Sequence, residues 1–182
     1  GPAGKILNRS YIVDEFGNIL SRYDKIHLFD IKFSEKESYC ESATVSGGQA
    51  AVICHTPLGC FGQTICYDLR FPHLYRKLSQ AGAKILLVPA AFTKKTGEAH
   101  WHVLNRARAI ENGAFVVAPC AVGKVEGGGE SYGYSLIINP WGEILADAGS
   151  DSGLINANID LEEVNSARMR IPSLKHDKTF EF

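Results

Sequence analysis

The middle of the chain alternates between strand-like and helix-like segments, and this alternation limits the possible folds more than any other feature. The strand-like segments are rich in apolar and β-branched residues, and the helix-like segments carry apolar residues at helical spacing. Pro72 precedes the first predicted helix and Gly113 follows the second. A strand, a helix and a further strand in this order predict a right-handed parallel crossover and therefore an α/β fold. The predicted strands cover residues 60–66, 84–89 and 114–118, and the predicted helices cover 73–81 and 98–112.

Three predicted β-hairpins surround this unit, each with two alternating segments and a turn that contains glycine. One further strand is predicted over residues 153–160, and a short helix over 161–170. In the helix 98–112, Val103, Ala107 and Ile110 form one apolar stripe, which we expect to face the sheet. The hairpin strands are predicted at 9–14 with 19–27, at 51–55 with 60–66, and at 132–139 with 143–148.

The remaining segments lack a sustained period. Residues 28–48 predict a long surface loop, and residues 123–130 predict a glycine-rich loop without the spacing of a phosphate-binding site. Residues 171–182 are mostly polar and predict an extended C-terminal arm. Because 182 residues suffice for one sizeable core, we expect a single domain over residues 1–182.

Charge and cysteine content argue against several classes of function. A net charge of -1 without a basic stripe disfavours nucleic acid and anionic membrane surfaces as partners, and no apolar run is long enough to span a bilayer. The five cysteines are an odd number and follow no apolar leader, so we expect free thiols in the cytoplasm. The cysteines form no C-x-x-C pair, and His100 and His102 fall on different helical faces, so we expect no metal site.

Cys66 lies where a predicted strand passes into the helix that follows Pro72. A side chain at such a junction is held on a tight turn, where main-chain N–H groups can stabilise a developing oxyanion. A nucleophilic cysteine is therefore one interpretation. A buried structural cysteine is the alternative, because free cysteine is among the most buried residue types.

A cysteine nucleophile needs a base or a positive charge nearby, because the free thiol is mostly protonated at neutral pH. Lys25, late in the predicted strand 19–27, and Glu41, in the loop 28–48, are candidates for these groups. Lys25 can instead reach water from the strand end, and Glu41 can be an ordinary loop carboxylate. His27 offers a Cys–His pair, but it faces the same side of the strand as Lys25 and competes with it electrostatically.

Several separate motifs follow one another along the chain. They are YDKIHLFD at 23–30, ES at 41–42, GQTICYDLRFP at 62–72, PAAF at 89–92, TGEAHW at 96–101, RARAIEN at 106–112 and NPWGEI at 139–144. In this order they closely resemble the nitrilase superfamily of carbon–nitrogen hydrolases. The resemblance extends from residue 8 to about residue 172 and is far more specific than any one motif.

The resemblance implies a four-layer α-β-β-α sandwich that dimerises, so that the expected partners are a small amide substrate and a second copy of the chain. It also implies a catalytic set of Glu, Lys and Cys with a second, supporting Glu, and a reaction that requires no metal and no organic cofactor. Matched residue by residue, Cys66 corresponds to the nucleophile, Lys25 to the lysine that stabilises the tetrahedral intermediate, and Glu41 to the supporting carboxylate.

The general-base glutamate of the family precedes the lysine, at the end of a strand in the first third of the fold. The acidic residues before Lys25 are Asp14, Glu15 and Asp24, and all three lie in the hairpin that follows this third. The chain is therefore expected to form an N-terminally incomplete sandwich that corresponds to the C-terminal two thirds of the domain.

Tyr67, Arg70 and Phe92 are the residues predicted to contact the substrate, because they flank the elbow or follow the next strand. Arg70 can instead be a structural ion-pair partner. Residues 66–72 and 130–133 are most similar to the branch that hydrolyses the amide of deaminated glutathione, with the ω-amidases close behind. The predicted activity is hydrolysis of a small carboxamide through a cysteine thioester. A nitrile or N-carbamoyl substrate, and an inactive fragment that retains the oligomerisation surface, remain alternatives.

Overall fold

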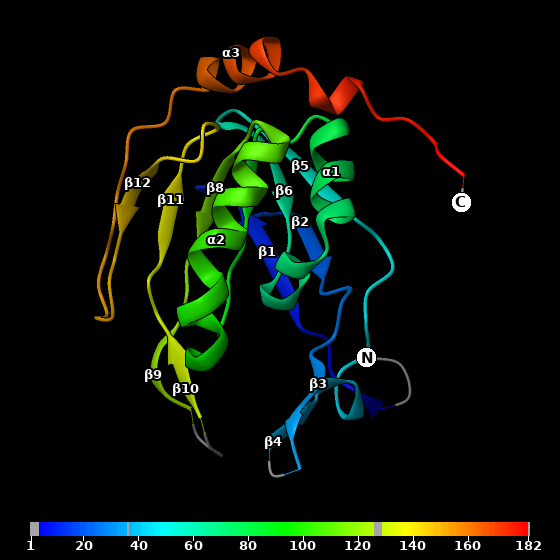
Figure 1. The fold of residues 1–182 in the computed structure, drawn as a ribbon, viewed down its shortest axis with the longest axis vertical. Coiled ribbons are helices and arrows are strands. Elements are labelled where there is room, and N and C mark those ends of the chain that lie inside the picture. Colours follow the sequence, from blue (N-terminus) through cyan, green and yellow to red (C-terminus); the bar gives the residue numbers. More distant parts are fainter. Residues whose placement is uncertain (1–3, 36, 126–128, 182) are drawn as a thin grey trace.

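A six-stranded mixed sheet forms the centre of the computed structural model, which describes residues 4–35, 37–125 and 129–181 (Figure 1). In sheet order its strands are β12 (Ile144–Asp147), β11 (Leu136–Ile138), β8 (Phe115–Ala118), β7 (Ile85–Leu87), β6 (Gly59–Gln63) and β5 (Val52–Thr56). The neighbours β6, β7 and β8 run parallel, and the outer strands join antiparallel. Helices connect the parallel strands, as the alternating sequence predicts, so the α/β class is confirmed.

Two helices, α1 (Pro72–Gln80) and α2 (Lys94–Asn112), cover one face of this sheet (Figure 1). The core on this side contains the fully buried Trp101 and Tyr75. Gly113 ends α2 with a φ of 51°, in the left-handed conformation that glycine adopts at little cost. The predicted stop of this helix is therefore correct, while its start lies four residues earlier than predicted.

The apolar stripe of α2 faces away from the sheet. Val103 and Ile110 are 66% and 52% exposed, whereas Asn105 and Arg108 are buried. Arg108 is satisfied there, since its Nε and Nη2 donate to the Leu69 carbonyl at 3.0 and 2.7 Å. The predicted orientation of this helix is therefore wrong, because polar side chains with buried hydrogen-bond partners occupy its inner face.

A hairpin of β1 (Arg9–Val13) and β2 (Ile19–Asp24) lies on the opposite face of the sheet (Figure 1). Gln63 of β6 connects the sheet to this hairpin by hydrogen bonds to Ser10 and Ser21. Of the four predicted layers, the described residues supply the helical layer of α1 and α2, the six-stranded sheet, and the two strands of this hairpin.

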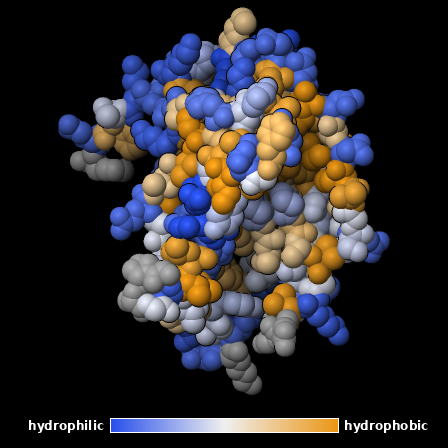
Figure 2. All heavy atoms as spheres, turned by 180° about the vertical axis from the view of Figure 1, so that it is seen from behind, coloured by the Kyte–Doolittle hydropathy of each residue, from blue (hydrophilic) through white to orange (hydrophobic). Residues whose placement is uncertain are grey.

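The rest of the face opposite α1 and α2 is apolar and only partly covered. Helix α3 (Glu162–Arg170) lies at one end of the sheet, where its Val164 packs against Phe115. Beside them Phe61 and Val117 stay half-buried. Figure 2 views this side and shows apolar residues gathered on it. Because sheets in α/β folds bury both faces, this face can bury a further layer.

The predicted loop 28–48 contains a second, small hairpin. Strands β3 (Asp30–Ser34) and β4 (Glu37–Cys40) pair antiparallel, and the 3-10 turn Glu41–Ala43 follows. These strands are short and rich in charged and polar residues, so their weak apolar alternation did not identify them.

Two other segments near the end of the sheet also differ from expectation. Residues 153–160 run past β12 in extended form but make no strand ladder within the described ranges (Figure 1). A short hairpin of β9 (Val122–Lys124) and β10 (Glu130–Tyr132) flanks the predicted glycine-rich loop. Residues 126–128 of that loop lie outside the described residues.

After α3 the chain passes along α1, with one 3-10 turn at Ser173–Lys175. Arg76 of α1 donates to the Ser173 carbonyl and to the Asp177 carboxylate, and the Gln80 amide lies 2.6 Å from the same carboxylate. These contacts are polar, so hydrogen bonds and an ion pair dock this segment. Across the ranges that the structure describes, no helix combines the length and apolar character of a membrane span.

Candidate active site

Cys66 occupies a strained turn just after β6. The strand ends at Gln63, and Cys66 opens the 3-10 helix η3 (Cys66–Arg70). Its φ of 49° lies in the left-handed region, which costs a non-glycine residue about 1–2 kcal/mol. Its N–H donates to the Pro89 carbonyl at 2.9 Å, which ties the turn to the segment after β7. The geometry therefore contains the predicted elbow between strand and helix.

Lys25 and Glu41 form a buried ion pair. Lys25 directly follows β2 and is 3% exposed, and its Nζ lies 2.6 Å from Glu41 Oε2. The same oxygen accepts the Phe29 N–H at 2.6 Å, and Oε1 accepts Asn8 Nδ2 at 3.1 Å. Burial opposes ionisation of Glu41, but the hydrogen bonds outweigh it and hold its pKa below the ordinary value. The carboxylate thus neutralises a lysine that would otherwise be costly to bury.

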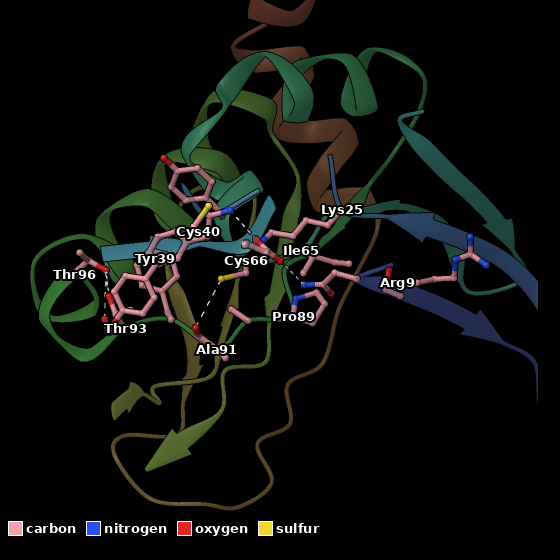
Figure 3. A pocket seen from close by; sticks show the side chains of 17 residues that line it. Arg9, Lys25, Tyr39, Cys40, Ile65, Cys66, Pro89, Ala91, Thr93 and Thr96 are labelled. Carbon is pink, nitrogen blue, oxygen red and sulfur yellow. Dashed lines mark hydrogen bonds and ion pairs between the residues drawn. The ribbon is translucent and has the colours of Figure 1, made fainter. Parts of the chain in front are cut away.

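Cys66, Lys25 and Glu41 line one cavity of about 710 Å³. Figure 3 shows Cys66 and Lys25 in its middle, with Tyr39 to one side and Arg9 pointing away on the other. Its walls come from the chain before β1, the segment after β2, the β3–β4 hairpin, the turn at η3 and the loop after β7. Residues that are distant in sequence therefore meet here, including all three predicted catalytic residues.

The Cys66 thiol points toward the Ala91 carbonyl, with 3.9 Å between Sγ and the oxygen (Figure 3). Burial raises the pKa of Cys66, and the positive charge of Lys25 lowers it part of the way back. The sulfur is therefore mostly protonated at neutral pH, and attack by it requires a base. Among the described residues that line the cavity, Glu41 is the one carboxylate, and it already binds the three donors named above.

The three predicted substrate-binding residues are placed differently. Tyr67 and Phe92 line the cavity, whereas Arg70 is not among the described residues that do so. The Arg70 guanidinium carbon lies 5.9 Å from the Tyr67 ring centroid and 5.2 Å from that of Phe92. Its Nη1 lies 3.3 Å from Nδ1 of His100. Arg70 thus stacks on two aromatic walls of the cavity.

Several residues of the site were not predicted from the sequence. Asn8 binds Glu41, and Tyr39, Thr93 and Thr96 line the cavity. The alternation in residues 37–40 is a weak signal for the strand that presents Tyr39. The two threonines carry no local signal, because only the tertiary fold brings them to the cavity.

Groups of three or more metal-binding side chains that could hold an ion do not occur within the described ranges. The cysteines are all free thiols, and two of them, Cys40 and Cys66, line the cavity. The reactive groups of the cavity therefore include two thiols, an ammonium, a carboxylate and hydroxyl groups, a set that suits acyl transfer through sulfur.

Comparison with known proteins gives one consistent result. The family model described as carbon–nitrogen hydrolase matches residues 2–169. Deaminated glutathione amidase from Synechocystis sp. (strain PCC 6803 / GT-S) is 47% identical over 178 residues, which cover 97% of this chain and 65% of that protein. Omega-amidase NIT2 from Homo sapiens is 36% identical over 177 residues, which cover 97% of this chain and 64% of that protein.

A solved structure agrees with these sequence matches. The C. elegans NitFhit protein superposes with a TM-score of 0.91 and 38% identity, over 98% of this chain and 44% of that chain. The chain thus spans about two thirds of the length of these two curated relatives, at 65% and 64%, and less than half of the NitFhit chain.

Proposed function

The chain belongs to the carbon–nitrogen hydrolase family and has the α/β fold of the nitrilase superfamily, and from this premise we propose that its protein hydrolyses the carbon–nitrogen bond of a small carboxamide. Cys66 is the nucleophile, Lys25 stabilises the oxyanion, and Glu41 supports Lys25. One observation carries the proposal, namely that a cysteine in a left-handed turn shares a cavity with a buried lysine–glutamate pair. Strained residues that are held by their surroundings concentrate at functional sites.

In the first half of the reaction, the Cys66 sulfur attacks the carboxamide carbon, and the carbonyl oxygen becomes an oxyanion. The Lys25 ammonium and the Tyr67 main-chain N–H donate to this oxygen. Such donors accelerate the reaction because the negative charge exists only in the transition state and the intermediate. The carbon–nitrogen bond then breaks, the nitrogen takes up a proton and leaves as ammonia or an amine, and a thioester remains.

In the second half, water attacks the thioester carbonyl and releases the acid and the Cys66 thiol. A base must accept a proton from Cys66 first and from the water later. Glu41 does not suit this role, because its oxygens are bound to Lys25, Phe29 and Asn8. The family resemblance assigns the role to a further glutamate, which precedes the lysine in the order of the family's catalytic residues. The raised pKa of Cys66 supports the need for such a base.

The substrate is proposed to be an amide of the kind named for the relatives, a deaminated glutathione or an ω-amide of a 2-oxo acid. The names of the Synechocystis and human relatives support this class over nitriles and N-carbamoyl compounds. The aromatic walls formed by Tyr67 and Phe92 would contact the carbon chain of the substrate.

The five free cysteines support a reducing compartment, and we place the protein in the cytoplasm. A measurement of its distribution in fractionated cells tests this assignment. Recovery with secreted or organellar markers would contradict it.

Ammonia release from an ω-amide by the protein of its natural gene, with Cys66→Ala beside it, tests the activity. Loss of the sulfur should reduce turnover by at least about a thousandfold, because the covalent route is then closed. Cys54→Ala, a variant of a buried cysteine outside the cavity, should retain activity. Undiminished ammonia release from Cys66→Ala would end the proposal.

The alternative is a fragment without activity that keeps an oligomerisation surface. The single cavity carboxylate among the described residues favours this alternative for residues 1–182 taken alone. The same ammonia assay on this chain alone separates the two, since a site without a base should release ammonia far more slowly than a complete amidase site.

A further inference from the structure

Asp68, two residues after Cys66, carries a buried carboxylate that binds four donors. Its Oδ2 accepts the Tyr23 hydroxyl at 2.6 Å and the Ile65 N–H at 2.9 Å. Its Oδ1 lies 3.0 Å from the His27 main-chain nitrogen and 2.7 Å from His27 Nδ1. Asp68 is fully buried, with 0% exposed, so these donors replace the water that a carboxylate otherwise requires.

The partners of Asp68 lie close in sequence to the two main catalytic groups of the proposed site, Lys25 and Cys66. Tyr23 and His27 lie two residues before and after Lys25, while Asp68 itself and its partner Ile65 flank Cys66. We propose that Asp68 is a positioning residue that holds the segment carrying Lys25 against the turn carrying Cys66. This inference rests on the proposed function of the same site and adds a residue that acts on both groups.

Other contacts make the connection stiff. The His27 ring stacks on Phe71 with 3.5 Å between the ring centroids and 7° between the planes. On the other side of the turn, Arg108 of α2 holds the Leu69 carbonyl. Because α2 fixes η3 in this way, the bonds of Asp68 determine where residues 23–27 lie relative to Cys66.

The thiol of Cys66 offers a readout that needs no turnover. The charge of Lys25 lowers the pKa of Cys66, so a lysine that moves away leaves less thiolate at a given pH and slows alkylation. The other charged or titratable groups that interact with Cys66 are Glu41, Arg70, Tyr75 and Cys120.

The test measures the rate of Cys66 alkylation by iodoacetamide against pH, by mass spectrometry of the complete chain. Tyr23→Phe and His27→Leu each remove a side-chain donor to Asp68. At a fixed pH below the midpoint, both should alkylate about three- to tenfold more slowly, as Lys25→Met does, because the ammonium no longer sits beside the sulfur. Tyr23→Phe combined with Lys25→Met should be no slower than Lys25→Met alone, since both act through the same charge.

Two variants separate positioning from general damage. His27→Asn keeps a side-chain N–H close to the place of Nδ1 and should restore the rate that His27→Leu loses. Tyr11→Phe removes a hydroxyl from an exposed residue of β1 and should alkylate like the wild type. Thermal unfolding confirms that each variant is folded, and if Tyr23→Phe does not fold, the pair His27→Leu and His27→Asn still decides the question.

The outcomes are distinct. Slower alkylation and a midpoint at higher pH in Tyr23→Phe and His27→Leu, with recovery in His27→Asn, support the positioning role. Wild-type profiles in the folded variants, while Lys25→Met is slowed, overturn that role and leave the proposed function intact. An unchanged profile in Lys25→Met overturns the proposed pairing of Lys25 with Cys66, and the positioning role falls with it.

Discussion

At the scale of single residues, Cys66 carries two separate costs. Its backbone is left-handed at a φ of 49°, and burial makes its thiol hard to ionise. A cysteine that served packing alone would need neither, because most backbone positions in a core are unstrained. The Pro89 carbonyl and the Asp68 carboxylate hold the turn in this conformation from two sides. This combination supports the proposal that Cys66 is the nucleophile.

The pH dependence of Cys66 alkylation should reflect the burial of its thiol. Burial raises the pKa of Cys66, so its thiolate and its alkylation rate should grow only at a higher pH than for an unperturbed cysteine, whose pKa is about 8.5. Below the midpoint the rate should fall about tenfold per pH unit, because only the thiolate reacts. In Lys25→Met the Cys66 profile should lie at still higher pH. Mass spectrometry of the alkylated Cys66 peptide measures the profile, and a midpoint below about 8.5 would contradict the effect of burial.

Glu41→Gln should destabilise the fold near neutral pH by roughly 3 kcal/mol, the lower end for breaking one partner of a buried pair. The folded-state pKa of Glu41 is lowered, so its contribution is present above the unfolded carboxyl pKa of about 4.3 and is lost as the pH falls through the folded value. Urea unfolding of both proteins should therefore converge on acidification.

Glu35→Gln is the matched control for this prediction. Glu35 pairs with Lys32 at 2.6 Å, but its side chain is 90% exposed. Its replacement should change the unfolding free energy by less than about 1 kcal/mol at any pH, because solvent screens exposed pairs. A difference for Glu41→Gln that persists unchanged into acid would show that the ion pair is not its cause.

At the scale of elements, the close packing of α1 and β7 around β6 depends on Gly62. A Cβ at this position would lie 3.1 to 3.2 Å from the side chains of Ala83, Leu86 and Leu78. Gly62→Ala should therefore cost about 1–3 kcal/mol of stability, as overpacking of a core does. Gly153→Ala is the control, because nothing lies within 4 Å of its added Cβ. Equal unfolding midpoints of the two variants would refute the tight packing.

The elements themselves were largely predictable from the sequence, because their signals are local. The hairpin of β5 and β6, the crossover through α1 and the stop of α2 at Gly113 follow from period, turn residues and caps. The orientation of α2 was not predictable in this way. Its inner face holds Asn105 and Arg108, and their burial depends on partners such as the Leu69 carbonyl. A strand also requires hydrogen bonds to a neighbouring strand, which a local sequence pattern does not predict. Residues 153–160 are extended but form no such ladder.

The site shows the same division. Cys66 is a candidate because it lies between a predicted strand and a predicted helix. Lys25 and Glu41 were candidates from their places in the chain, and the family resemblance assigned their roles. The role of Asp68 was not visible, because an aspartate in a short turn is common and its partners Tyr23 and His27 are 45 and 41 residues away. Only the folded chain shows that one carboxylate joins both segments.

At the scale of the whole molecule, the outer face of α2 is the surface that we propose for the dimerisation expected from the family resemblance. Val103, Ile110 and Trp141 are 66%, 52% and 54% exposed, and the turn 140–143 lies against the helix, since Arg106 Nε donates to the Gly142 carbonyl at 2.8 Å. Apolar side chains grouped in this way commonly mark an interface.

Val103→Glu combined with Ile110→Glu should convert an oligomer of the protein to monomers, because an interface would have to bury two carboxylates. Sedimentation velocity at several concentrations measures the change. Phe16→Glu is the control, since Phe16 is 82% exposed at the turn between β1 and β2 and should leave the assembly intact. A monomeric wild type, or an unchanged oligomer in the double variant, would rule out this surface as the interface.

The order of strands in the central sheet has a consequence for how the chain assembles during synthesis. From β5 to β12, each strand of the central sheet pairs with the strand of this sheet that comes before it in the sequence. This sheet can therefore add one strand after another as the chain emerges from the ribosome. Lys25 leaves the ribosome earlier than Cys66 but can reach its final place only after the turn at η3 exists to receive Tyr23 and His27. In pulse-labelled amide exchange during refolding, the amides of β6 and β7 should accordingly become protected before those of residues 23–27. Lys25 would then reach its final position after the strands that are synthesised later.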